Sequence, residues 1–176
     1  TIGCTRDDAI GEAFDKVGRV MGLPYPGGAE MDRLASIGDP DAIKFPSAAV
    51  VGDNLDFSFS GLKTAVINHI HNCEQKGTDY SREDIAASFT KTVVASVLKK
   101  LGMAFDQTGC RQFVLAGGVA ANSHLRGALE KFCAERGVRF CVPPKSLCGD
   151  NAAMIGAQGY YEYLAGKRAD TSLHAF

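Results

Sequence analysis

The sequence predicts an α/β protein, because its last third alternates strand-like and helical segments. A short β-rich run begins at Gln112, turns at Gly117 and Gly118, and continues as an amphipathic helix. A second β-rich run at 138–144 precedes another helix. Strands joined through a crossover helix pair in parallel, so this β-α-β-α order indicates a sheet that is at least partly parallel. A long amphipathic pattern at 81–109 predicts an extended helix.

Composition places the chain among soluble globular proteins. Its 176 residues suit one moderately large domain, and its 6 Pro and 20 Gly indicate many turns. Hydrophobic residues make up 45%, yet no apolar run approaches the ~20 residues that cross a bilayer, which argues against membrane insertion. The formal net charge of −1 argues against global electrostatic capture of nucleic acid, while a local basic patch stays open.

The six cysteines form no CxxC pair and have no histidine at zinc-finger spacing. We interpret them as reduced, partly buried thiols of a cytoplasmic protein. The first residues contain no Met, and no basic region followed by an apolar core, so they do not form a signal peptide. From this start we expect the chain to be a fragment, cut or processed upstream.

Periodicity and turn residues organise the first half of the chain. Residues 7–23 place apolar side chains at helical spacing behind two acids, which predicts a helix. Two prolines and a Gly-Gly pair at 22–30 predict a loop, and a shorter helix is expected at 29–38. Residues 45–59 alternate weakly like a strand, and the chain becomes helical near Leu62.

Two later helices carry recognisable start signals or a defined core face. In the helix at 81–109, Ser81 is a candidate N-cap, and Asp84 takes the usual Glu or Gln position of a capping box. The apolar face of that helix is formed by Ile85, Phe89, Val93, Val97 and Leu101. The helix after the Gly-Gly turn is expected to bury Leu125, Leu129 and Phe132.

Ligand chemistry is expected where strands end and helices begin, because ligands of open α/β sheets collect at the carboxyl ends of strands. Gly117 and Gly118 allow a tight turn and close approach of the backbone to a ligand. The following helix offers free N–H groups to an anionic or polar partner. Asn122 is either the N-cap of that helix or a hydrogen-bonding contact, and the Gly-Gly pair alone is equally consistent with a simple turn.

Asp150 has two interpretations at this stage. It is either a cap or first-turn acid of the last helix, or a ligand of a divalent ion above a helix start made of small residues. One carboxylate cannot hold an ion alone, and His69 and His71 would point about 200° apart on a helix. These two, His124 and His174 are interpreted as surface or packing histidines, so no metal site is complete within the chain.

An acidic stripe lies on the first predicted helix, where Asp8, Glu12 and Asp15 are spaced to share one face. Such a stripe is usually solvated. Repulsion among three like charges suggests that one carboxylate has a hydroxyl or cationic partner, and ribose hydroxyls are a typical partner of this kind. The nearby "YPGG" segment is either a plain turn or a place where the backbone lies against the same nucleoside.

Four motifs occur in an order typical of one family: "DDAIGEAFDKVGRVMGLPYPGG", "FSFSGLKTAV", "LAGGVAANSHLR" and "CGDNAAMIG". With them the chain resembles, from about Asp7 to Gly166, the C-terminal half of the TsaD/Gcp family of tRNA adenosine threonylcarbamoyltransferases, once labelled O-sialoglycoprotein endopeptidases. The resemblance implies an actin-like ATPase fold of the sugar-kinase and heat-shock-chaperone superfamily, with this chain forming most of the second lobe. It also implies an absent N-terminal lobe that carries two metal-binding histidines and a Gly-rich phosphate loop.

The resemblance implies site residues one by one. Asp15 would bind ribose, Gly28 would contact it from the loop, and Asp32 matches a nucleoside-contact position in some relatives. Asn122 would hold the nucleoside end, and Asp150 would complete an iron site begun by the absent histidines. No catalytic step is assigned, including to Lys63 of the second motif.

The implied reaction moves a threonylcarbamoyl group from threonylcarbamoyl-AMP to the exocyclic amine of the adenosine beside the anticodon, in tRNAs that read ANN codons. The implied cofactor is one divalent metal per subunit, with Fe²⁺ as the ion. The implied partners are tRNA, a TsaB-like paralogue and a TsaE-like ATPase. We expect the chain alone to be inactive and to self-associate through its interlobe surface. The alternatives are a related O-carbamoyltransferase and a non-catalytic scaffold of the same fold.

Overall fold

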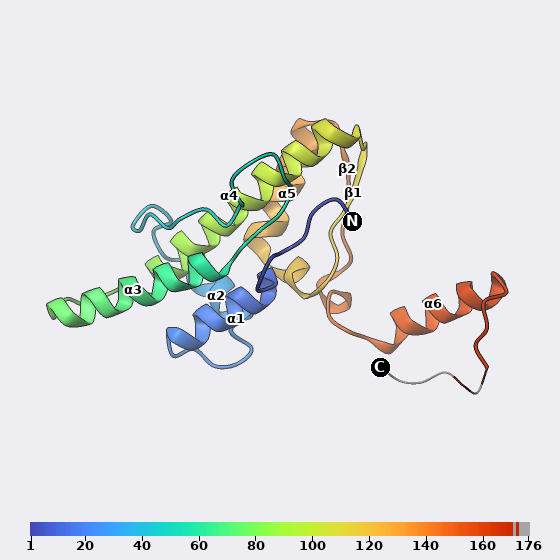
Figure 1. Ribbon diagram of the computed structural model, residues 1–176. Helices are drawn as coiled ribbons and strands as arrows, with labels where there is room; N and C mark the ends of the chain where they lie inside the picture. The colour runs from blue at the N-terminus through green and yellow to red at the C-terminus, as the bar shows by residue number, and fades with distance from the viewer. Residues whose placement is uncertain (171, 173–176) are drawn as a thin grey trace.

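The computed structural model describes residues 1–170 and residue 172. Helices dominate this part of the chain, with two short strands near its end (Figure 1). In chain order the elements are α1 (Ile10–Val20), α2 (Gly27–Ala35), α3 (Ser60–Lys76), α4 (Arg82–Thr108), β1 (Gln112–Val114), η1 (Gly118–Ala121), α5 (Ser123–Glu135), β2 (Arg139–Cys141), η2 (Lys145–Leu147) and α6 (Ala152–Leu164).

The largest hydrophobic core lies among the first four helices. α1 packs against α2 and α3, and α2 packs along α4. At the centre, the rings of Phe14 and Phe89 meet edge to face with centroids 5.1 Å apart. Of the face expected for α4, Ile85, Phe89 and Val93 are fully buried here, whereas Val97 and Leu101 are half-buried against the second core. The core predicted from helical periodicity is therefore the one that the chain forms.

A second layer is built on the predicted β-α-β unit. β1 and β2 pair in parallel, with Phe113 opposite Phe140. α5 packs against β2 on one side and against the second half of α4 on the other. Leu125 and Leu129 are buried in this layer as expected, whereas Phe132 is only half-buried and stacks on Phe105. The parallel pairing and the α/β class are both confirmed.

The segment at 45–59 departs from the weak strand pattern. Within the described residues, it forms only isolated bridges, from Phe57 to Thr5 and to Ala49. Its carbonyl groups are satisfied in another way: the Lys100 ammonium, 3% exposed, donates to the carbonyl oxygens of Val50 and Asn54 at 2.6 Å each. A buried lysine thus satisfies two carbonyl groups beside the few backbone hydrogen bonds that the segment keeps, such as that from the Ser58 amide to the Ala48 carbonyl oxygen.

Helix starts were predicted more securely at α4 than at α2. The Ser81 hydroxyl accepts from the Asp84 amide at 3.0 Å, which confirms the N-cap. The Asp84 carboxylate does not complete a capping box and instead accepts from the Asp39 amide at 2.8 Å. α2 begins at Gly27, two residues earlier than expected, because Gly27 packs directly against Gly18 of α1.

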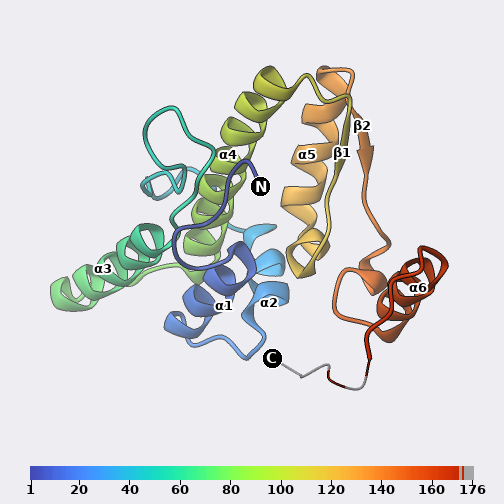
Figure 2. The same ribbon diagram turned by 45° about the vertical axis from the view of Figure 1, so that its right-hand side comes forward.

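α6 differs from every other long helix. It extends away from the body in both orientations shown (Figures 1 and 2) and contains no buried residue. Ile155 and Tyr161 remain 66% and 67% exposed. In the described part of the chain, no helix is long and apolar enough to cross a membrane.

The six cysteines are all free. Cys133 and Cys148 are buried, Cys73 and Cys141 are half-buried, and the other two are exposed. Burial raises the pKa of the Cys133 thiol, which keeps it protonated and unreactive at neutral pH. The prediction of reduced, partly buried thiols is confirmed.

Candidate functional site

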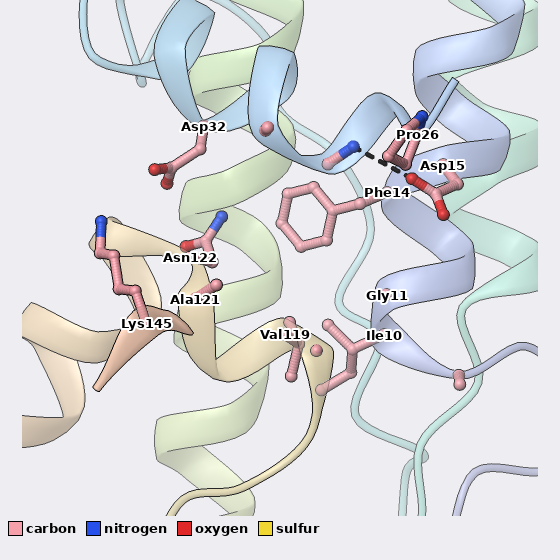
Figure 3. A pocket seen from close by; sticks show the side chains of 14 residues that line it. Ile10, Gly11, Phe14, Asp15, Pro26, Asp32, Val119, Ala121, Asn122 and Lys145 are labelled. Carbon is pink, nitrogen blue, oxygen red and sulfur yellow. Dashed lines mark hydrogen bonds between the residues drawn. The ribbon is translucent and has the colours of Figure 1, made fainter. Parts of the chain in front are cut away.

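The main pocket has a volume of about 810 Å³ and lies between α1, α2 and the turn around η1 (Figure 3). Its walls are mostly small or apolar, with Ile10, Phe14 and Val119 as the larger side chains. The polar side chains on its lining are Asp15, Asp32, Asn122 and Lys145. A pocket with apolar walls and a few polar groups suits a flat organic ligand with several hydrogen-bonding positions.

Asp15 lies on α1 and faces the start of α2 across the pocket rim. Its Oδ1 accepts a hydrogen bond from the Gly28 amide at 3.0 Å. Among the described residues no group donates to Oδ2, so this oxygen is available to a ligand hydroxyl. The two helices approach closely because both contact residues are glycines: a Cβ built on Gly18 would lie 3.2 Å from the Gly27 Cα.

Asp32 fixes the opposite wall by joining α2 to α5. Its Oδ1 accepts from the amide of Ser123 at 2.9 Å and from the Ser123 hydroxyl at 3.0 Å. Nearby, His124 Nε2 lies 3.2 Å from the Ser36 hydroxyl and 3.3 Å from the Asp32 carbonyl oxygen. A carbonyl oxygen only accepts, so Nε2 carries the proton of this contact. Hydrogen bonds between α2 and α5 therefore hold this wall of the pocket in place.

Asn122 is 8% exposed and stands where η1 passes into α5. Its Oδ1 accepts from the Leu125 amide at 2.8 Å, so the N-cap interpretation is confirmed. The amide nitrogen of the same side chain stays in the pocket (Figure 3). Gly117, with φ of 86°, provides the left-handed backbone that aims the turn at the pocket. Asn122 can thus cap the helix and contact a ligand at once.

Asp150 is not brought to this pocket. It is exposed, and it lies outside the pocket lining, between η2 and α6. The cap of α6 is Asn151, whose Oδ1 accepts from the Met154 amide at 3.0 Å. The interpretation of Asp150 as the cap residue is therefore wrong, because its neighbour fills that role.

No metal cluster is present in the part of the chain that the structure describes: nowhere do three His, Cys, Asp or Glu side chains come together. His69 lies beside Phe45 and 3.9 Å from the Cys73 sulfur, and His71 is exposed. His124 takes part in the contact between α2 and α5. These three are packing or surface residues as predicted, whereas His174 lies outside the described residues.

The acidic stripe resolves into two groups. Lys16 Nζ lies 2.5 Å from Asp8 and 2.8 Å from Glu12, and Lys63 Nζ lies 4.0 Å from Asp8. The hydrogen bond to Asp8 raises the pKa of Lys16. Two acids of the stripe thus have lysine partners, and Asp15 alone turns to the pocket.

Sequence reasoning missed two residues that shape this region. Asp7 caps α3, because its carboxylate accepts from the Phe59 amide at 2.7 Å and from the Ser58 hydroxyl. Lys145 lines the pocket from η2. A usable signal existed for Lys145, since it follows the second parallel strand and side chains at that end of a strand are expected near ligands.

The fold defines the class of protein first: an α/β chain with an actin-like fold, corresponding to the second lobe of that fold. Two solved structures share the fold. Full-length HypF, crystallised in its phosphate- and nucleotide-bound form, has a TM-score of 0.63 and 19% identity over 92% of this chain and 21% of its own. HypF from T. kodakarensis has a TM-score of 0.65 and 19% identity, covering 90% of this chain and 20% of its own.

The chain belongs to the TsaD family, the tRNA N6-adenosine threonylcarbamoyltransferases, whose family model matches residues 1–157. It is 52% identical to the enzyme of that name from Moorella thermoacetica over 174 residues, and 51% identical to the one from Bacillus cereus over 175. Each alignment covers 99% of this chain and 51% of the relative. The chain therefore spans about half the length of the curated relatives it matches.

Proposed function

We propose that this chain forms the nucleoside-binding half of a tRNA threonylcarbamoyltransferase, within a full-length protein of the relatives' size. The observation that carries the proposal is the pocket, which joins Asp15 and Gly28 of the first motif, Asp32 shortly after it, and Asn122 of the third motif. The names of the relatives supply the reaction class. The HypF structure, described as nucleotide-bound, supports a nucleotide as the ligand of this fold.

The pocket residues suit the parts of a nucleoside. The free oxygen of Asp15 would accept from a ribose hydroxyl, while its other oxygen keeps the Gly28 amide in place. Gly28 has no side chain to block that approach. The apolar side chains of Ile10, Phe14 and Val119 would cover the faces of the base. The Asn122 amide would donate to the same ligand, and Asp32 would border it.

The proposed reaction forms one bond and breaks one. The exocyclic nitrogen of the tRNA adenosine bonds to the carbamoyl carbon, the bond from that carbon to the AMP phosphate oxygen breaks, and AMP leaves as the amine loses a proton. An adenine amine is a weak nucleophile, so correct positioning has to supply much of the rate enhancement. The target adenosine lies in a single-stranded loop, so it can be presented without opening a duplex.

We also propose Asp150 as one ligand of a divalent metal, with Fe²⁺ as the ion. Its carboxylate is exposed and has no hydrogen-bond partner among the described residues, and carboxylate oxygen suits such an ion. The other ligands would have to come from beyond these residues. When bound, the ion would act as a Lewis acid on the carbamoyl-threonine group. We further propose a cytoplasmic enzyme that works with a TsaB-like paralogue and a TsaE-like ATPase.

The test is Asp15→Asn in the full-length protein. Asparagine keeps an acceptor for the Gly28 amide but turns a donor toward the pocket, so the fold is preserved while the ribose contact is lost. A hydrogen bond to a charged group contributes ~1.5–3 kcal/mol, which corresponds to a loss of about 10-fold or more in adenosine and AMP affinity. Calorimetry measures the binding, and transfer from threonylcarbamoyl-AMP to tRNA is assayed alongside.

The matched control is Asp106→Asn, which alters an exposed acid paired with Arg136 far along α4. It should leave both affinity and transfer unchanged. A wild-type protein that binds neither adenosine nor AMP would contradict the proposal. A second arm uses Asp150→Ala: bound iron and transfer should both fall, and unchanged metal content would remove Asp150 from the metal site.

A further inference from the structure

Lys145 is the one pocket-lining residue with a positive charge among the residues that the structure describes. It lies in η2, just beyond the end of β2. In Figure 3 its amino group extends toward the end of the pocket that holds Asp32 and Asn122, while Asp15 lies at the other end. Two carboxylates, one ammonium and the Asn122 amide therefore share a pocket with otherwise small or apolar walls.

The Lys145 ammonium stabilises no contact within the part of the chain that the structure describes. In contrast to Lys16, Lys63 and Lys100, its ammonium makes no hydrogen bond or ion pair with any described residue. Its backbone is held independently of the side chain, since the Cys148 amide donates to the Lys145 carbonyl oxygen at 3.2 Å. Removing the charge should therefore leave the fold intact.

The charges of the pocket create a problem for an anionic ligand. Asp15 and Asp32 both line the pocket with a carboxylate, and each repels a phosphate. A neutral nucleoside would meet no such repulsion, whereas a nucleotide needs a compensating cation. Lys145 is the cation that this lining supplies, and an ammonium on a flexible stem binds phosphate oxygens as a point charge.

We infer that Lys145 contacts the phosphate of the bound nucleotide and so makes the pocket prefer a nucleotide over the corresponding nucleoside. The inference rests on the proposed function, and names a specificity-determining residue for it. It assigns the two ends of the pocket different tasks. Asp15 binds the sugar hydroxyls, and Lys145 binds the phosphate.

The experiment compares AMP with adenosine in the full-length protein carrying Lys145→Gln. AMP affinity should fall about 5- to 10-fold, since a charge-assisted contact with phosphate is lost, while adenosine affinity should stay within about 2-fold. Lys145→Arg should restore most of the AMP affinity. The wild-type preference for AMP should weaken as salt is raised, and the Lys145→Gln variant should show little of that dependence.

Lys131→Gln is the matched control, because this lysine is 80% exposed on α5 and makes only a 4.0 Å contact with Glu135. It should change neither affinity. Equal losses of AMP and adenosine in Lys145→Gln would overturn the inference in favour of a contact with the base, and no loss of either would overturn it outright. Both results leave the proposed function standing if Asp15→Asn still lowers adenosine affinity about 10-fold or more, so the two failures are distinguishable.

Discussion

α4 and α6 are both clear helices in sequence and structure, yet they stand in opposite environments. α4 runs through both layers of the body and contributes the buried centre of the core. α6 has a higher share of apolar residues, and every one of its apolar side chains remains exposed or half-buried. The difference teaches that apolar periodicity predicts a helix, but burial requires a surface to pack on.

The comparison also separates the two groups of candidate site residues. Asp15, Gly28, Asp32 and Asn122 belong to the packed body, so their mutual geometry is set by buried neighbours. Asp150 precedes α6 and has no such neighbours. The geometry of the proposed nucleoside pocket is thus set by packing within this chain, whereas that of the proposed metal site is not.

The largest effect is expected at the centre of the body. Phe89→Ala should lower the free energy of unfolding by about 3–5 kcal/mol, because a fully buried ring leaves a cavity beside Phe14. Ile155→Ala in α6 should change it by less than about 0.5 kcal/mol. Urea unfolding followed by circular dichroism measures both. A comparable loss for Ile155→Ala would mean that α6 is buried in solution.

A moderate effect on stability is expected from removing the N-cap of α4, and none from removing the N-cap of α6, although both caps use a side-chain oxygen. Ser81→Ala should lower the free energy of unfolding by ~1 kcal/mol, because Ser81 caps the helix on which the core depends. Asn151→Ala removes the cap of α6 and should leave global unfolding unchanged, while amide hydrogen exchange in α6 becomes faster. Slower exchange in α6, or equal global losses, would contradict the contrast between the regions.

The smallest effect concerns pH. Desolvation acts to raise the pKa of Asp7, but hydrogen bonds from Ser58, Phe59 and Ser60 outweigh it, and the net pKa lies below the ordinary 3.8. A carboxyl with a lowered folded-state pKa stabilises the fold fully above its unfolded value and loses that contribution as pH falls through the folded value. Asp7→Asn should therefore destabilise slightly at neutral pH.

The stability gap between wild type and Asp7→Asn should shrink as pH falls below 3.8, where the wild-type carboxyl becomes protonated. Thermal unfolding of both proteins across this range measures the gap. A gap that is constant with pH would show that Asp7 acts through its shape and not its charge. α6 contains no comparable anchoring carboxyl and serves as the internal reference by hydrogen exchange.

Much of the fold followed from periodicity and capping, because these are local properties. The core face of α4, the Ser81 cap and the parallel β1–β2 pair could all be predicted from residues close in sequence. The irregular path of 45–59 could not, since it depends on the buried Lys100, which lies about fifty residues away and reads as a surface lysine in an amphipathic pattern.

The candidate site shows the same contrast between features that local sequence predicts and contacts that depend on residues far apart in the chain. Strand ends and glycine turns pointed to Asn122, and the spacing of acids pointed to Asp15. The hydrogen bond from Ser123 to Asp32 was not predictable, because it joins residues 91 apart in sequence. Lys145 was overlooked although it follows the second strand, because a single lysine has no spacing pattern that would mark it as a site residue.

The contact between Gly18 and Gly27 has a consequence beyond packing. At these two positions any added side chain would act as a wedge between α1 and α2 and would move Asp15 away from the Gly28 amide. Substitutions at Gly18 or Gly27 would therefore change the affinity for the proposed ligand, although neither residue would touch it.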